Sequence, residues 1–205
     1  MEVLPVSAFT ALQEELERQP LTVNNYRIRT GVGRSQTFGI VRRRCLPPDY
    51  SRQNWLRPYL FKLLTDFADQ YVDISWNAIT VNQGYKAGPH YDRHNVGDSY
   101  LVAFGEYEGG ELLLHHDDVV TEYVDVCRQP IITDFSKVLH SVADFQGSRY
   151  SLVFYWTPQP DNLPDWAVRK VNDEWRFFRG DQMLTRRNGL PHPLRKLKPA
   201  AGGEL

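Results

Sequence analysis

The sequence has few cysteines and no long hydrophobic run. Its 205 residues include only Cys45 and Cys127, which are too few for a disulfide framework and are not spaced from any histidine as in a zinc site. No apolar run approaches the roughly 20 residues that span a bilayer. The first twenty residues lack the basic and apolar regions of a signal peptide. We therefore expect an intracellular protein, cytoplasmic or nuclear or made from a viral genome in a host cell, that is neither secreted nor membrane-bound.

The chain also has almost no net charge, at −1, which gives no whole-chain argument for a nucleic-acid partner. The charges are nevertheless uneven. Residues 22–44 contain no acidic residue and six arginines, and residues 169–198 contain nine Lys/Arg against three acidic residues, a local balance of +6. The six arginines are Arg27, Arg29, Arg34, Arg42, Arg43 and Arg44. These basic flanks either bind phosphates or are solvated surfaces.

The hydrophobic pattern predicts a mainly β protein with flanking helices (α+β). Helical spacing is found in 9–19 and in 54–71, where Pro58 suits a first turn. From about residue 73, short β-branched and aromatic runs follow one another without helices between them, which predicts an antiparallel sandwich or barrel with the helices packed outside. A further hairpin is expected to turn at Asn172-Asp173.

We expect one domain in three parts. Residues 1–72 form a helical and basic support region, residues 73–158 form the β core, and residues 159–205 form a basic C-terminal extension. The sequence contains no internal repeat and no indication of the oligomeric state.

The most informative residues are His90, Asp92 and, 48 positions after Asp92, His140. Alternate residues of a strand face the same side, so His90 and Asp92 can point at one ion, with His140 supplied by a later strand across the barrel. A single His-x-Asp is common by chance. Two histidines and one carboxylate nevertheless form the ligand set that holds Fe(II) and leaves coordination positions open.

Arg149 and Ser151 follow the second histidine on a strongly strand-like run and share one face. A buried Arg in an apolar strand requires an anionic partner. That partner is either a carboxylate ligand, which a guanidinium binds with two parallel hydrogen bonds, or an acidic side chain of the protein.

These motifs, with GYKAGPH before His90, EYEGGELLL between and LVFYW after, resemble the Fe(II)/2-oxoglutarate-dependent dioxygenases over about residues 76–156. The resemblance implies a double-stranded β-helix (a cupin-like jelly roll), with Fe(II), 2-oxoglutarate and O2 as cofactor and cosubstrates. It implies that His90, Asp92 and His140 ligate iron and that Arg149 and Ser151 bind the distal carboxylate of 2-oxoglutarate. By the same resemblance, Asn82 and Tyr85 contact 2-oxoglutarate.

Other polar residues lie near the motif. Asn95 and Ser99 are expected to line the pocket or to serve in turns. We do not expect His94 to bind metal, because its spacing of four residues from His90 would place both on one face only in a helix. Nor do we expect this of the run from His115 to Asp118, because neighbouring strand residues face opposite sides, or of His192, which has no metal-binding residue near it in the sequence.

The substrate is less well defined by the sequence. The run GRSQTFGIVRRR resembles the small TET/JBP-like nucleobase oxygenases, which implies that the protein oxidises the methyl group of 5-methylcytosine or thymine in DNA, held by its basic segments. Arg34, Arg42, Arg43 and Arg44 are the candidate contacts. The EYEGGEL run equally suits a prolyl-hydroxylase-like oxygenase acting on a protein side chain or small molecule. A jelly-roll binding module without chemistry is the third alternative.

Overall fold

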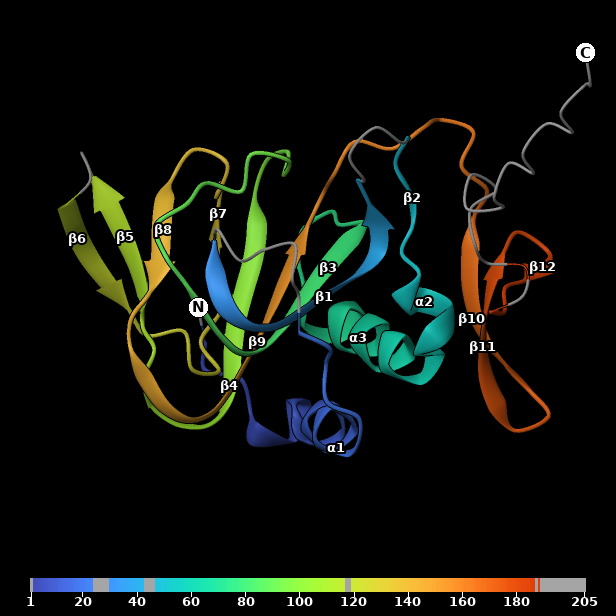
Figure 1. The fold of residues 1–205 in the computed structure, drawn as a ribbon, viewed down its shortest axis with the longest axis horizontal. Coiled ribbons are helices and arrows are strands. Elements are labelled where there is room, and N and C mark those ends of the chain that lie inside the picture. The colour runs from blue at the N-terminus through green and yellow to red at the C-terminus, as the bar shows by residue number, and fades with distance from the viewer. Residues whose placement is uncertain (1, 24–29, 43–46, 117–118, 187, 189–205) are drawn as a thin grey trace, which may run out of the picture.

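The structure is a computed structural model that describes residues 2–23, 30–42, 47–116, 119–186 and 188. Short helices occupy much of the N-terminal third, and strands dominate the rest (Figure 1). The helices are η1 (Val6–Ala8), α1 (Thr10–Arg18), α2 (Gln53–Leu56) and α3 (Pro58–Tyr71). No helix of the described residues is long and apolar enough to cross a membrane.

The expected helix over 54–71 is in fact two helices that meet at Arg57. Arg57 has φ −135° and ψ 56°, outside the helical region, and Pro58 is the first residue of α3. Proline disfavours a helical conformation in the residue before it and cannot donate the backbone hydrogen bond of a continuing helix. The proline therefore begins a helix here, as its first-turn preference predicts, and also ends the short one before it.

Two antiparallel sheets form the core and correspond to the expected jelly roll. The larger sheet has the order β2-β1-β3-β9-β4-β7, and the smaller has the order β6-β5-β8. The strands of the larger sheet are β1 (Gly31–Val41), β2 (Asp49–Tyr50), β3 (Ala78–Ala87), β4 (Ser99–Gly109), β7 (Ile131–Thr133) and β9 (Phe145–Tyr155). Those of the smaller sheet are β5 (Leu112–His116), β6 (Val119–Val124) and β8 (Leu139–Val142). Residues 31–50 thus add two strands to the larger sheet.

The two faces of the larger sheet bury different residues. On one face, Ile79, Val81 and Phe154 pack with the apolar sides of α1 and α3 in the main hydrophobic core. On the other face, Leu101 and Val153 meet Leu112 of the smaller sheet in a second apolar cluster. The pocket described below lies on this second face, between the sheets.

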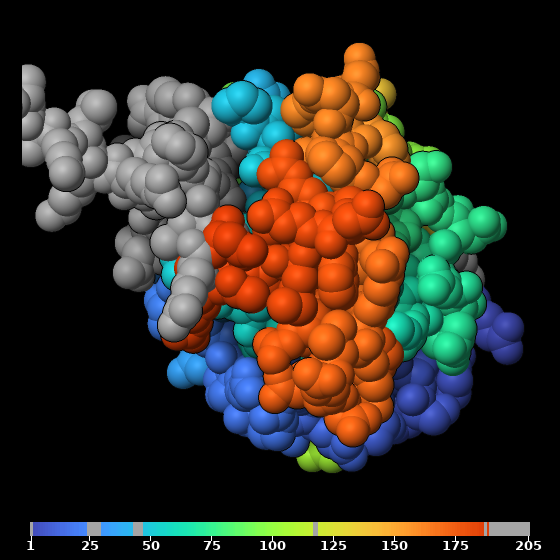
Figure 2. Space-filling model, turned by 90° about the vertical axis from the view of Figure 1, so that its right-hand side faces the viewer, coloured from blue at the N-terminus to red at the C-terminus, as the bar shows by residue number. Residues whose placement is uncertain are grey.

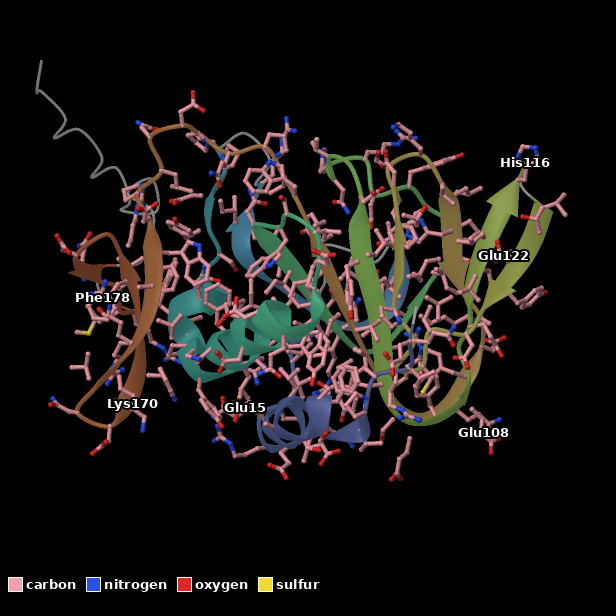
Figure 3. All side chains as sticks on the ribbon, turned by 180° about the vertical axis from the view of Figure 1, so that it is seen from behind. Glu15, Glu108, His116, Glu122, Lys170 and Phe178 are labelled. Atoms are coloured by element: carbon pink, nitrogen blue, oxygen red, sulfur yellow. The ribbon has the colours of Figure 1, made fainter. Side chains whose placement is uncertain are left out.

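A third antiparallel sheet covers the far end of the helices. Its strands are β10 (Trp166–Val171), β11 (Glu174–Arg179) and β12 (Gln182–Met183). The turn is at the expected Asn172-Asp173, whose φ angles of 50° and 61° are those of a type I′ hairpin turn. Phe177 packs on Phe61 of α3 with ring centroids 5.9 Å apart. Figure 2 shows the outer surface of this sheet, and Figure 3 shows Lys170 and Phe178 on it, far from the smaller sheet.

Candidate metal centre and anion pocket

The two histidines are neighbours in the backbone hydrogen-bond network. His90 N donates to His140 O at 3.0 Å, and His140 N donates to His90 O at 3.1 Å, so the loop after β3 is paired with β8. Residues paired in this way project their side chains to the same side. The imidazole rings accordingly lie next to each other, with centroids 4.3 Å apart. His140 therefore adjoins His90, in contrast to the expectation that it faces it across the barrel.

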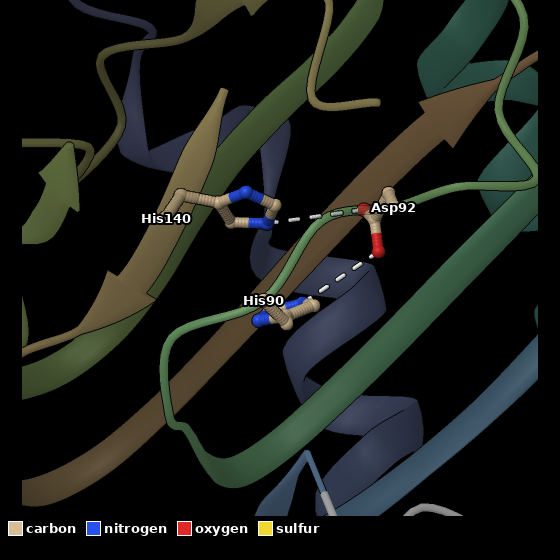
Figure 4. Close-up of side chains that lie close together, drawn as sticks. All are labelled: His90, Asp92 and His140. Carbon is tan, nitrogen blue, oxygen red and sulfur yellow. Dashed lines mark ion pairs between the residues drawn. The ribbon is translucent and has the colours of Figure 1, made fainter. Parts of the chain in front are cut away.

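Asp92 completes the group from a turn (Figure 4). Its backbone N donates to Phe135 O at 2.9 Å, and its carbonyl accepts from Asn95 N at 2.9 Å, which fixes the turn. One carboxylate oxygen lies 3.6 Å from His90 Nε2 and the other lies 3.9 Å from His140 Nε2. One donor atom from each of the three residues lies within 4.8 Å of the others, which is close enough to share one ion.

Both histidines are held with Nε2 directed at this point. His90 Nδ1 lies 2.8 Å from Gly88 O, and His140 Nδ1 lies 2.9 Å from Val138 O. A carbonyl can only accept, so each Nδ1 carries the proton and each Nε2 keeps a free lone pair. Burial lowers the pKa of His140, which favours the neutral ring that a metal requires, although the hydrogen bond with Val138 acts in the opposite direction. The donor set therefore fits Fe(II).

Arg149 lies in the same pocket as the three metal-ligand candidates. Its side chain is buried, with the residue 3% exposed, and no ion pair joins it to an acidic residue in the described part of the chain. Its Nε has no hydrogen-bond partner. Burial lowers the pKa of the guanidinium, partly offset by the nearby Tyr107. A buried cation without a counter-ion is costly, and the arrangement fits an anionic ligand better than the structural ion pair that the sequence left open.

Three more of the expected residues line this pocket. Asn82 Nδ2 donates to Ser151 Oγ at 3.1 Å across the β3–β9 pair, and Asn82 Oδ1 is buried without a partner. Tyr85 is 6% exposed, and its hydroxyl lies 2.9 Å from Thr30 Oγ1. A β-bulge between β1 and β3, where Gly84 adopts φ +56°, shifts the alternation of β3 so that Tyr85 faces the pocket with Asn82.

Neither a protein-family model nor a curated protein sequence matches the chain. Three solved structures with related folds can be named. NgTET1 in complex with 5mC DNA is 16% identical, with TM-score 0.48, over 75% of this chain and 69% of that chain. A Pseudomonas putida prolyl-4-hydroxylase is 17% identical, with TM-score 0.47, over 77% and 90%. A 2OG-Fe(II) oxygenase family oxidoreductase from Burkholderia pseudomallei is 19% identical, with TM-score 0.48, over 74% and 81%. At these values the likenesses do not decide a function, which has to rest on the site.

The remaining candidate residues are spread over several places. Asn95 lines the pocket and donates from Nδ2 to Ser99 Oγ at 3.1 Å, whereas Ser99 is completely buried behind it. Arg42 lies in an open cleft beside the pocket. Arg34 pairs with Gln83 on the face of the larger sheet turned towards α1, where it donates to Leu21 O, and it lines neither the pocket nor the cleft. Arg43 and Arg44 lie outside the described residues.

The metal-ligand group found among the described residues consists of His90, Asp92 and His140. His94 is exposed in the open cleft, and His116 is exposed at the end of β5. His115 is directed at Ser141, with Nε2 to Oγ at 2.8 Å. Asp117, Asp118 and His192 lie outside the described residues.

Three kinds of residue beside the candidate site could not be found from the sequence. Gly88 and Val138 act through backbone carbonyls, which leave no side-chain signal. Tyr107 and Phe145 flank Arg149 but look like ordinary strand aromatics in the sequence. Arg93 could not be found because its place in the open cleft depends on the turn at Asp92, which the sequence does not specify.

Proposed function

We propose that the protein is an Fe(II)- and 2-oxoglutarate-dependent dioxygenase that hydroxylates a C–H bond. One observation carries this proposal: two histidines and an aspartate converge on one point in a pocket that also contains Arg149, a buried cation that forms no ion pair with the described residues. A structural metal site fills its coordination shell with protein ligands, whereas three ligands leave positions open. A metal site with open positions beside a carboxylate-binding cation is suited to a cosubstrate that binds both.

The residues divide the work between them. His90, Asp92 and His140 would hold the iron, and Arg149, Ser151 and Asn82 would orient the cosubstrate. When bound, Fe(II), 2-oxoglutarate and O2 supply the oxidation of C–H to C–OH, with succinate and CO2 as the other products. Leu112, Val142 and Val153 line the pocket with apolar side chains that would limit the access of water, and no side chain is needed as a general base.

Succinate formation tests this function directly. The protein is incubated with Fe(II), 2-oxoglutarate and O2, and succinate is measured by mass spectrometry. We expect formation that depends on iron and is lost in His140→Ala, because the loss of one ligand leaves two. His115→Ala is the matched control, since His115 lies on the strand paired with β8 but is directed away from the group. Equal succinate from wild type and His140→Ala would exclude the proposed site.

We further propose that the substrate is DNA and that the target is the methyl group of 5-methylcytosine or thymine. The open cleft shares His90 and Asp92 with the metal pocket and is lined by Arg42 and Arg93. Asp92 is the one acidic side chain among the described residues that line it, and it is a metal-ligand candidate. A cleft of this charge beside the metal suits a polyanion. A base flipped out of a duplex could reach the pocket while the arginines hold phosphates.

Two experiments separate this substrate from the alternatives. Methylated single- and double-stranded DNA is incubated with the protein, Fe(II) and 2-oxoglutarate, then digested to nucleosides for mass spectrometry, where oxidised 5-methylcytosine or thymine is expected. Arg93→Gln should weaken DNA retention and reduce the salt slope by about 1, whereas Arg34→Gln, on the other face of the sheet, should not. Succinate formation without any oxidised base would instead favour the prolyl-hydroxylase-like alternative.

A further inference from the structure

The guanidinium of Arg149 is flanked by two aromatic rings. Its central carbon lies 5.4 Å from the centroid of Tyr107 on β4 and 5.6 Å from that of Phe145 on β9. The two rings meet edge to face, with centroids 6.5 Å apart and an interplanar angle of 73°. These distances are those of cation–π contacts, which gain strength when the cation is desolvated. The aromatic faces therefore compensate part of the charge that burial leaves without a counter-ion.

Each of these three large side chains stands opposite a glycine in the β4–β9 pair. Arg149 is paired with Gly105, Tyr107 with Gly147, and Phe145 with Gly109. A Cβ added at Gly105, Gly147 or Gly109 would stand 2.0, 2.3 or 2.4 Å from the backbone oxygen of Ser148, Glu106 or Asp144, so the close approach of the two strands leaves no room for a larger partner in these pairs. Each of these three β4–β9 pairs thus contains one large side chain and one glycine. Arg149, Tyr107 and Phe145 can therefore reach one another diagonally across the two strands.

A fourth glycine lies against the guanidinium itself. A Cβ added at Gly110 would stand 2.8 Å from Arg149 Nε, 2.9 Å from Arg149 Cδ and 3.1 Å from Phe145 Cβ. Gly110 also has φ +75°, which L side chains rarely adopt. Any side chain at this position would have to displace the arginine or the adjoining phenylalanine.

We propose that Tyr107, Phe145 and Gly110 form a cage that positions Arg149 to bind the second carboxylate of a 2-oxo dicarboxylic acid. The two aromatic faces attract the cation, and the Tyr107 side chain also hydrogen-bonds to it, whereas an acidic side chain would neutralise its charge. The cage therefore holds the guanidinium in place and leaves its charge and its unpaired Nε donor for the ligand. The cage rests on the proposed function for the identity of the acid, and Tyr107 and Phe145 are positioning residues that act through Arg149.

Binding without turnover is the test. The protein is loaded with Mn(II) in the absence of O2, and binding of 2-oxoglutarate is measured by calorimetry. We expect about tenfold weaker binding in Tyr107→Leu, a smaller loss in Tyr107→Phe, which keeps the ring but removes the hydroxyl, and a larger loss in Gly110→Ala. Gly180→Ala is the matched control, because Gly180 also has a positive φ of +54° but its added Cβ would meet only Pro164 Cβ at 3.7 Å.

Pyruvate distinguishes positioning from a general distortion, because it keeps the 2-oxo acid group and lacks the second carboxylate. Its affinity should be the same in wild type, Tyr107→Leu and Gly110→Ala. Equal loss of pyruvate and 2-oxoglutarate binding overturns the cage, as does unchanged 2-oxoglutarate binding in Gly110→Ala or no 2-oxoglutarate binding by the wild type. Binding that follows the expected pattern without succinate formation would keep the cage and overturn the proposed oxidation. Succinate formation with a KM for 2-oxoglutarate that is unchanged in Gly110→Ala would keep the proposed oxidation and overturn the cage.

Discussion

The two faces of strands β3 and β9 differ sharply in how well their polar atoms are paired, although residues of the two faces alternate along the same strands. Towards the helices, Ile79, Leu152 and Phe154 are completely buried among apolar side chains. Towards the smaller sheet, Arg149 is buried and Asn82 is half-buried, yet the buried atoms Asn82 Oδ1 and Arg149 Nε have no hydrogen-bond partner. Burial of apolar side chains on the first face stabilises the fold, whereas burial of unpaired polar atoms on the second costs free energy.

This contrast shows how one sheet can stabilise the fold on one face and hold unpaired polar atoms on the other. The period of two in a strand places consecutive residues in separate environments, so the polar face can be poorly satisfied without opening the apolar core. Substitutions on the helix face should therefore reduce stability, whereas substitutions on the pocket face should mainly reduce ligand binding.

The largest effect is expected for Phe154→Ala on the helix face. Phe154 contacts the rings of Phe67, Trp76 and Tyr100, with centroids within 5.9 Å, and its removal leaves a cavity. We expect the free energy of unfolding in urea to fall by about 3–5 kcal/mol, with a smaller fall in Phe154→Leu. A fall below 1 kcal/mol would show that the helix face does not carry the stability.

Metal binding at the pocket face should raise the free energy of unfolding of the protein. Mn(II) at one hundred times its dissociation constant should add about 2.7 kcal/mol to the free energy of unfolding, because only the folded chain brings the ligands together. Asp92→Ala should abolish this gain. Asp98→Ala, an exposed acid of the same loop, should keep it. A gain of equal size in both variants would place the ion elsewhere.

Arg149→Met should separate stability from binding. The variant removes a buried charge that has no acidic partner, so its free energy of unfolding should be unchanged or higher by up to about 2 kcal/mol. Binding of 2-oxoglutarate to the Mn(II) protein should be lost. Arg34→Met, on an exposed side chain of the other face, should leave both quantities near wild type. A destabilised Arg149→Met would mean that the cation is better compensated than its contacts indicate.

The smallest effect is expected for Ser151→Ala. The change removes the acceptor for Asn82 Nδ2, a hydrogen bond worth about 0.5–1.5 kcal/mol. Unfolding should change by no more than that, and 2-oxoglutarate binding should weaken several-fold, as measured by urea titration and calorimetry. A loss of stability as large as that of Phe154→Ala would remove the distinction between the two faces.

Much of the site could be predicted because its residues have distinctive chemistry at regular spacing. His90 and Asp92 are two apart, as are Arg149 and Ser151, and period-two alternation correctly placed the second pair on one face. The hairpin at Asn172-Asp173 was found because both residues tolerate positive φ. The strand-rich region after residue 73 and the outer helices followed from apolar periodicity in the same way.

What could not be predicted depends on pairings between distant segments. The bridge between His90 and His140 is a tertiary contact, and no local pattern distinguishes adjacent strands from opposite ones. The position of Arg34 follows from the bulge near Gly33 and Gly84, which resets which residues face the helices. Strand β8 is only four residues long and is set by its partner β5, so its own sequence carries little signal.

The paired peptide groups of His90 and His140 have a consequence for how the candidate site would take up a metal. The ligands are already joined by two backbone hydrogen bonds and fixed by Gly88 and Val138, so the ion does not have to organise the chain around itself. Such a protein folds first and is loaded afterwards, unlike small domains that are unfolded without metal. Zinc, cobalt and nickel generally bind nitrogen and oxygen ligands more tightly than Fe(II). The ion found in the purified protein will then reflect the supply of metals in the cell that made it.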